Sequence, residues 1–241
     1  MRQSLAIAIQ AAGGIAAAAL LAAAGWYGYD LLARRPIEAI RFTGDTARVP
    51  AADLERLAAG LRGREAREVA LPAVREAVKR LPWVRECAVR RMLAGTLEVA
   101  IEAHAPLARW GEDRLVSDRG EIFAAQFEGP LPLFSGPEGT APEMAAAWAR
   151  IRQAAAPLAI PVVEIRLSER RAWQARLASG LAIELGRGEI EVRLARFAAA
   201  WPQLAAEDRA ATRADLRYPN GFALRGPAAG ETETAPRKRG A

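Results

Sequence analysis

Cysteine and histidine are nearly missing from this chain, which has one of each among its 241 residues. The single cysteine, Cys87, excludes an internal disulfide framework and any metal site built from several cysteines. The single histidine, His104, has no second histidine and no cysteine near it in the sequence. We therefore expect His104 on the surface or at the end of a strand rather than in a metal site or as a catalytic base.

Signatures of enzyme chemistry are missing as well. The sequence has no GxSxG nucleophile elbow, HExxH zinc motif, Walker loop or GxGxxG dinucleotide loop. Its LGRGE segment at 185–189 has a bare Gly-Arg-Gly, which favours a tight strand-to-helix turn because a phosphate loop also needs Gly-Lys-Ser/Thr. We expect no catalytic residue, no metal and no cofactor.

Neither sign of charge dominates the chain. The 34 Lys and Arg residues exceed the 28 Asp and Glu residues by only six, and arginines are scattered among the acids. This mixture is typical of a solvated surface and not of a nucleic-acid-binding stripe. The hydrophobic content of 51% is enough for a packed core. We expect a folded protein with no nucleic-acid partner and no small-molecule substrate.

A long uncharged segment stands near the amino terminus, at residues 5–29. As a helix it would measure about 37 Å, which exceeds the hydrocarbon core of a bilayer at about 30 Å. Its last residues include Trp26, Tyr27 and Tyr29, the residue types of an aromatic belt. The segment predicts a transmembrane helix after a short end at 1–4. Small residues at 22–24 leave a cleaved signal peptide as the alternative.

Apolar spacing predicts the element order β-α-α-β-β over residues 36–105. A strand is expected at 37–43, amphipathic helices within 50–63 and 71–82, and two strands on either side of 93–95. Nine apolar side chains are expected to form the core: Ile40, Phe42, Leu54, Leu57, Val74, Val78, Leu97, Val99 and Ile101.

Residues 106–226 predict a mostly antiparallel sheet with helices on one face. A hairpin pattern surrounds 118–120, strand-like segments occupy 162–185, and apolar stripes predict helices that include Trp148 and Phe197. The predicted fold class is therefore α+β. Residues 227–241 are polar and predict a disordered tail.

The order and spacing of several segments resemble one family. The segments IRFTGD, LPWVRECAVRR, LEVAIEAHAPLARW, LVSDRGEIF, RRAWQARLASGLAIELGRGE and ADLRYPNGFAL are similar to the periplasmic part of the bacterial cell-division protein FtsQ, called DivIB in other bacteria. The resemblance covers about residues 36 to 225. It implies a POTRA domain at 36–105 followed by a β domain at 106–226.

This resemblance implies a non-enzymatic scaffold of the divisome in the bacterial inner membrane. The amino terminus would be cytoplasmic and the bulk of the chain periplasmic, at the division septum, although the distribution of arginines around residues 5–29 favours the opposite orientation. The implied partners are FtsB and FtsL, with recruitment through the POTRA domain. A POTRA-bearing outer-membrane assembly or secretion factor and a cell-wall hydrolase are the alternative functions.

The last strand-like segment, GFALR, has no later segment to pair with. An exposed strand edge can accept a strand from another chain. The resemblance implies partner contacts on this strand, on the Arg-Tyr before it and on the first arginine of RRAWQ. Where some relatives have a Trp near the end of the strand, this chain has Arg225-Gly226, so the aromatic anchor is either missing or supplied by Phe222. The predicted partner-binding residues are Arg170, Arg217, Tyr218, Asn220, Gly221, Phe222, Ala223, Leu224 and Arg225.

Overall fold

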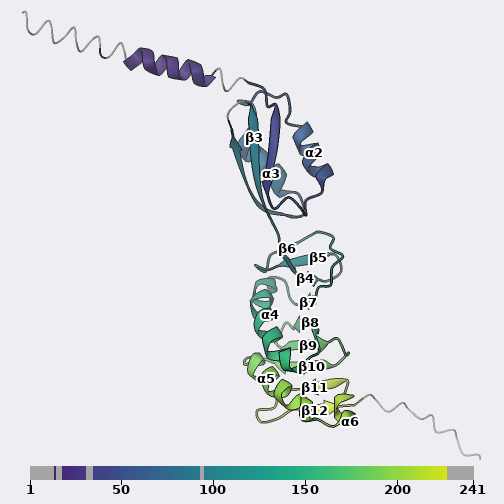
Figure 1. Cartoon of the computed structure of the whole chain (residues 1–241). Helices are drawn as coiled ribbons and strands as arrows, with labels where there is room; N and C mark the ends of the chain where they lie inside the picture. The colour runs from purple at the N-terminus through teal and green to yellow at the C-terminus, as the bar shows by residue number, and fades with distance from the viewer. Residues whose placement is uncertain (1–13, 15–17, 31–34, 93–94, 227–241) are drawn as a thin grey trace, which may run out of the picture. The chain divides into compact units, whose positions relative to one another are not determined.

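A computed structural model describes residue 14 and residues 18–30, 35–92 and 95–226 of the chain (Figure 1). Residues 18–30 are helical. No helix in these described stretches has both the length and the apolar character that crossing a membrane requires. The predicted transmembrane helix includes residues 5–13 and 15–17, which lie outside the described residues.

The chain divides into two compact units, Met1–His104 and Ala105–Ala241. The first unit has the element order expected from the sequence, β-α-α-β-β. Its three-stranded sheet has the order β1-β3-β2, in which β1 is parallel and β2 antiparallel to the central β3. The elements are β1 Ala39–Gly44, α2 Ala51–Ala59, α3 Leu71–Lys79, β2 Val84–Arg91 and β3 Thr96–Ala103.

The core of the first unit is centred on β3 and α3. Leu97, Val99 and Ile101 alternate along β3 with exposed fractions of 4% or less, and Val78 on α3 is fully buried. The helix ends at Lys79, before Pro82, because proline disfavours helical backbone at the residue before it. The expected core is thus confirmed for these residues and for Val74.

Four side chains expected in this core are only half-buried: Ile40, Phe42, Leu54 and Leu57. Strand β1 lies at an edge of the sheet, so one side of it lacks a strand neighbour. Leu57 lines a groove of about 480 Å³ between α2 and α3. These positions are therefore less enclosed than their helical and strand spacing predicted.

The second unit is built on a sheet of nine strands among the described residues, in the order β12-β11-β10-β9-β8-β7-β4-β5-β6. Five of the eight strand pairings are antiparallel, as the sequence predicted, and the pairs β10–β11, β7–β8 and β4–β7 are parallel. The strands are β4 Pro106–Trp110, β5 Arg114–Ser117, β6 Ile122–Phe123, β7 Leu133–Ser135, β8 Val162–Leu167, β9 Trp173–Leu177, β10 Ala182–Gly186, β11 Arg213–Asp215 and β12 Ala223–Arg225.

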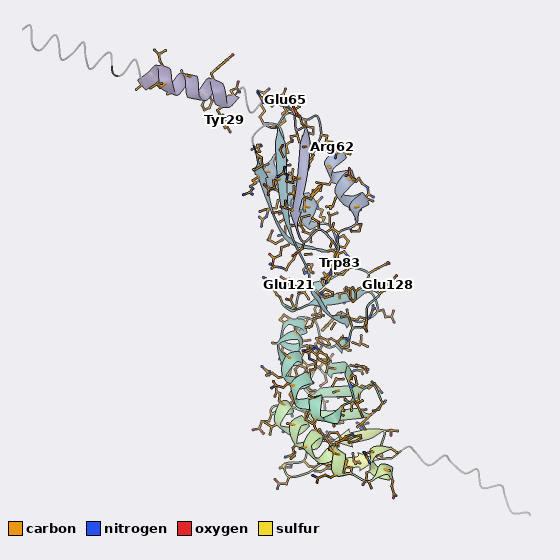
Figure 2. All side chains as sticks on the ribbon, in the orientation of Figure 1. Tyr29, Arg62, Glu65, Trp83, Glu121 and Glu128 are labelled. Atoms are coloured by element: carbon orange, nitrogen blue, oxygen red, sulfur yellow. The ribbon has the colours of Figure 1, made fainter. Side chains whose placement is uncertain are left out.

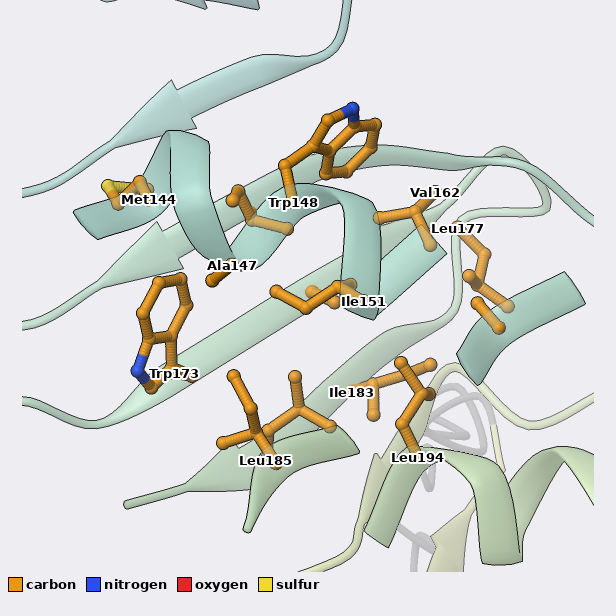
Figure 3. Packing of buried hydrophobic residues seen from close by; sticks show 14 of the residues in the cluster. Met144, Ala147, Trp148, Ile151, Val162, Trp173, Leu177, Ile183, Leu185 and Leu194 are labelled. Atoms are coloured by element: carbon orange, nitrogen blue, oxygen red, sulfur yellow. The ribbon is translucent and has the colours of Figure 1, made fainter. Parts of the chain in front are cut away.

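Two helices, α4 Ala141–Ala155 and α5 Ile190–Ala200, lie along one face of this sheet (Figure 1). Their apolar sides meet the inward side chains of the strands in one buried cluster, in which Ile151 of α4 points toward Ile183 and Leu194 (Figure 3). Trp148 also contacts Phe134 edge-on, with ring centroids 5.4 Å apart. The α+β fold of both units is confirmed.

The connection from β10 to β11 determines which strand ends the sheet. Helix α5, a short turn at Trp201–Gln203 and helix α6 Ala206–Arg209 link these two strands, which are parallel. A parallel pair needs such a crossover. The Pro-Asn-Gly turn at 219–221, in contrast, lets β12 fold back antiparallel on β11. Strand β12 thereby becomes one of the two edge strands of the described sheet, the other being β6.

Candidate functional site at the terminal edge strand

Strand β12 pairs with β11 on one side only. Its three residues face Arg213, Ala214 and Asp215 of β11. No other strand of the described residues lies on the outer side of β12. Such an edge presents backbone N–H and C=O groups to solvent.

The hydrogen bonds of β11 identify which groups of β12 point outward. Ala182 donates to the carbonyl of Thr212, and Leu216 donates to the carbonyl of Glu184, each at about 2.9–3.0 Å. The even-numbered residues of β11 therefore face β10, and the odd-numbered ones face β12, because successive residues alternate sides. Ala223 and Arg225 are the register partners of the odd-numbered residues. It follows that the N–H and C=O of Leu224 point away from the sheet.

The side chains of this segment are divided between core and solvent. Leu224 and Phe222 are half-buried and pack against the core of the second unit, whereas Ala223 and Arg225 are exposed. The ring of Phe222 meets Phe197 of α5 edge-on, with centroids 5.0 Å apart. The core thus holds Phe222, which the sequence proposed as an aromatic anchor for a partner.

The predicted arginines lie at the same end of the sheet as the start of β12. Arg170 lies in the turn between β8 and β9, and Arg217 lies two residues after the end of β11. Because β8 and β11 run in the same direction and β12 folds back on β11, both arginines lie at the end of the sheet where β12 begins. Arg217 follows β11, the strand next to β12, whereas β9, β10 and β11 separate β8 from β12. Arg170 is exposed and makes no hydrogen bond or ion pair within the described part of the chain.

Arg217 is already paired within the chain. Its Nε and Nη2 atoms donate to the two carboxylate oxygens of Asp215 at 2.8 and 2.6 Å, and its backbone N–H donates to the same group. The hydrogen bonds from the Arg217 side chain are the main cause that lowers the pKa of Asp215. The side-chain stem passes over Gly186, where a Cβ atom would lie 3.0 Å from Cγ of Arg217. Glycine at this position leaves room for the arginine.

Tyr218 and the turn that follows it are held by a residue that the sequence did not single out. Tyr218 has an exposed fraction of 53%, and Asn220 is also exposed. Arg196 of α5 donates to three carbonyl oxygens. These are the carbonyl oxygens of Pro219, of Tyr218 at 2.9 Å and of Gly221 at 3.4 Å. Its sequence context gave no signal for this role, because an exposed helix arginine is common. The predicted strand GFALR is also too long, since Gly221 and Phe222 precede β12.

Elsewhere, charged side chains pair with one another at the surface. Figure 2 labels Arg62 and Glu65 in the first unit, and these two residues pair with Glu55 and Arg67 respectively. Among the described residues, no group of three His, Cys, Asp or Glu could hold a metal ion. His104 follows the end of β3 and is half-buried, as expected for a strand-end histidine.

Comparison with known proteins adds two family matches. Residues 35–104 match the profile described as "POTRA domain, FtsQ-type", and residues 108–217 match "Cell division protein FtsQ/DivIB, C-terminal". The second match includes Arg170 and Arg217 and ends before Tyr218. Strand β12 therefore lies beyond the matched residues.

Relatives with similar sequences bear the name "Cell division protein FtsQ". The protein of Burkholderia pseudomallei is 39% identical over 217 residues, which are 86% of each chain. The protein of Xanthomonas campestris pv. campestris is 36% identical over 83% of this chain and 72% of its own length. That of Bordetella pertussis is 36% identical over 86% of this chain and 85% of its own length. With both family profiles matched in order, the chain belongs to the FtsQ/DivIB family of cell division proteins.

Proposed function

We propose that this chain is a non-enzymatic, single-pass scaffold of the bacterial cell-division machinery. The observation that carries the proposal is the open outer edge of β12, in a chain whose relatives are named cell division proteins. A scaffold needs surfaces for partners and no reactive groups. The comparisons favour neither an outer-membrane assembly factor nor a cell-wall hydrolase.

In this proposal, residues 1–4 are cytoplasmic and residues 5–29 cross the inner membrane. The POTRA domain at 36–105 and the β domain at 106–226 lie in the periplasm, followed by the tail at 227–241. The uncharged composition of residues 5–29 and the division of the chain after His104 support this arrangement.

The partner is an FtsB-like single-pass protein, itself associated with an FtsL-like one, and it adds a strand to β12. The N–H and C=O of Leu224 supply the hydrogen bonds of the new pairing. Arg170 and Arg217 lie at the end of the sheet where β12 begins, and their positive charge favours an acidic partner segment that extends across this end. Within the described residues, Arg170 has both prongs of its guanidinium group available for a carboxylate, whereas Arg217 would share its charge between the partner and Asp215. Tyr218 contributes an exposed ring at the same end of the sheet.

Substitution of Leu224 tests the strand addition most directly. Leu224→Pro removes the outward N–H and leaves the ladder groups of Ala223 and Arg225 in place. Leu224→Ala is the matched control, because it removes the same half-buried side chain and keeps the N–H. We expect Leu224→Pro to weaken FtsB binding at least about tenfold beyond Leu224→Ala, the scale of one or two hydrogen bonds. Affinity would be measured with the full chain in detergent and FtsB of the same bacterium.

Charge reversal tests the arginines independently. Arg170→Glu and Arg217→Glu should each lower the affinity for FtsB, and their effects should shrink as salt rises, because exposed charges are screened. Arg152→Glu, an exposed site on α4, serves as the control for net charge. Equal binding by Leu224→Pro, Leu224→Ala and both reversed arginines would contradict the proposed site.

A further inference from the structure

The turn between β11 and β12 is fixed from outside the sheet by helix α5. The Nη1 atom of Arg196 donates to the carbonyl of Pro219, and Nη2 donates to those of Tyr218 and Gly221. One guanidinium group thus holds three of the four residues from 218 to 221. Hydrogen bonds from a charged guanidinium group to carbonyl oxygens are stronger than hydrogen bonds between two neutral groups.

The next residue of the same helix holds the other end of the turn. Phe197 is fully buried and packs edge-on against Phe222, the residue just before β12. Arg196 and Phe197 therefore act together: one binds the backbone of the turn, and the other binds the first side chain after it. Strand β12 has only three residues. Its far end is held by the pairing with β11, by the packing of Leu224 and by hydrogen bonds from Thr212 to Arg225, whereas its beginning is held by this turn.

We propose that Arg196 is a positioning residue for partner binding, which keeps β12 formed in the free protein without touching the partner. The inference rests on the proposed function and adds a residue outside the strand itself. A partner strand can add only to an edge that is already in strand conformation. Its apparent affinity falls in proportion to the fraction of molecules in which the edge is formed.

Arg196→Ala and Arg196→Lys separate this role from a simple effect of charge. Alanine removes both the charge and the hydrogen bonds. Lysine restores the charge, but its single ammonium group cannot reach the carbonyls that the two Nη atoms bind separately. A positioning role predicts that both variants lose affinity for FtsB, about tenfold for alanine and less for lysine. A role in net charge predicts that Arg196→Lys binds like the unaltered chain.

Arg150→Ala provides the matched control. Arg150 is an exposed arginine on α4 that contacts α5 through its ion pair with Glu191 at 2.7 Å. In the described part of the chain it makes no hydrogen bond to residues 218–221, whereas the half-buried Arg196 does. Its substitution removes the same charge and loosens the same helix, so we expect FtsB binding to stay within about twofold of the unaltered chain.

Amide hydrogen exchange in the free full chain measures the positioning without any partner. We expect faster exchange at Ala223 and Arg225 in Arg196→Ala, with β9 and β10 unchanged, and the loss of FtsB affinity should persist at high salt. The loss of affinity in Arg170→Glu should instead shrink at high salt, because salt screens the interaction between residue 170 and the acidic partner segment. Unchanged exchange in residues 221–225 would overturn the positioning role.

Unchanged FtsB binding by Arg196→Ala, despite faster exchange at β12, would also overturn the positioning role of Arg196. If Leu224→Pro and the reversed arginines leave FtsB binding intact, the proposed docking site fails, and the role of Arg196 in binding fails with it. Faster exchange at Ala223 in that case would still establish Arg196 as a structural clamp of the turn. The failures of the two proposals are therefore distinguishable.

Discussion

At the scale of single residues, Glu86 links a helix to a strand in the first unit. Its carboxylate accepts hydrogen bonds from the backbone N–H of Cys87 and from Arg75, and it pairs with Lys79 at 3.4 Å. The bond from Cys87, followed by that from Arg75, lowers the pKa of Glu86 from 4.5 to about 2. The charged form is thus the one that the folded state favours.

The pH dependence of stability follows from this lowered pKa. A carboxylate of this kind stabilises the fold above its ordinary pKa of 4.5, and the contribution is lost as the pH falls toward about 2. We expect Glu86→Gln to lower the free energy of unfolding modestly at pH 7 and to differ little from the unaltered chain near pH 2. Denaturant unfolding of the full chain at several pH values measures this, with exchange of the β2 and β3 amides reporting on the first unit.

The same experiment in an Arg75→Ala background serves as a control. Because Arg75 and the backbone of Cys87 both hold Glu86, removal of Arg75 should reduce the effect of Glu86→Gln without abolishing it. A constant difference between Glu86→Gln and the unaltered chain from pH 7 to pH 2 would contradict the assigned interaction.

At the scale of elements, burial differs between positions that the sequence treated alike. Val99 is fully buried at the centre of β3, whereas Leu57 is half-buried beside the groove between α2 and α3. Helical and strand periodicity identifies the inward face of each element. It does not reveal how closely two elements approach, because that distance depends on side chains from both.

Aspartate substitutions at these two positions should therefore differ in effect. Val99→Asp places a charge without a partner in the core and should cost about 4 kcal/mol or more, enough to unfold the first unit. Leu57→Asp can direct its carboxylate into the groove and should cost about 1–2 kcal/mol. Hydrogen exchange of the β3 amides in the full chain measures both. Similar losses for the two variants would show that the groove is closed in solution.

Much of the fold was predictable from local patterns, and the candidate site was predictable only in part. The order of elements in the first unit, the hairpin around 118–120 and the terminal position of the last strand each follow from apolar spacing and turn residues. The parallel pairing of β10 with β11 does not, because it joins segments separated by α5. Arg196 could not be found for the same reason: its three carbonyl partners lie more than twenty residues away.

At the scale of the whole molecule, the proposed insertion of residues 5–29 into the inner membrane leaves two orientations, and only one of them lets the two folded units meet periplasmic partners. Arginines on the carboxyl-terminal side of this segment outnumber those before it, which favours a cytoplasmic location for the units. Large folded regions, however, translocate largely regardless of charge. The proposed binding of FtsB at β12 requires the second unit to be exported.

Reporter fusions decide between these orientations. We expect a reporter enzyme that works only outside the cytoplasm to be active when fused after Gly226, and a reporter that works only inside to be inactive there. The same pair fused before Met1 should give the opposite result, which controls for expression of each fusion. Activity of the cytoplasmic reporter after Gly226 would contradict the proposed topology, and with it any periplasmic partner for β12.

The first residue of the mature chain distinguishes a membrane anchor from a cleaved export signal. An uncleaved chain should begin at Met1 and remain with the membrane fraction after a high-salt or alkaline wash, because residues 5–29 stay in the hydrocarbon core. A chain that begins near Gly25 would be released by the same wash while the exported reporter stayed active. That result would remove the anchor and leave the β12 edge available to FtsB, so membrane attachment and partner binding can be tested independently of each other.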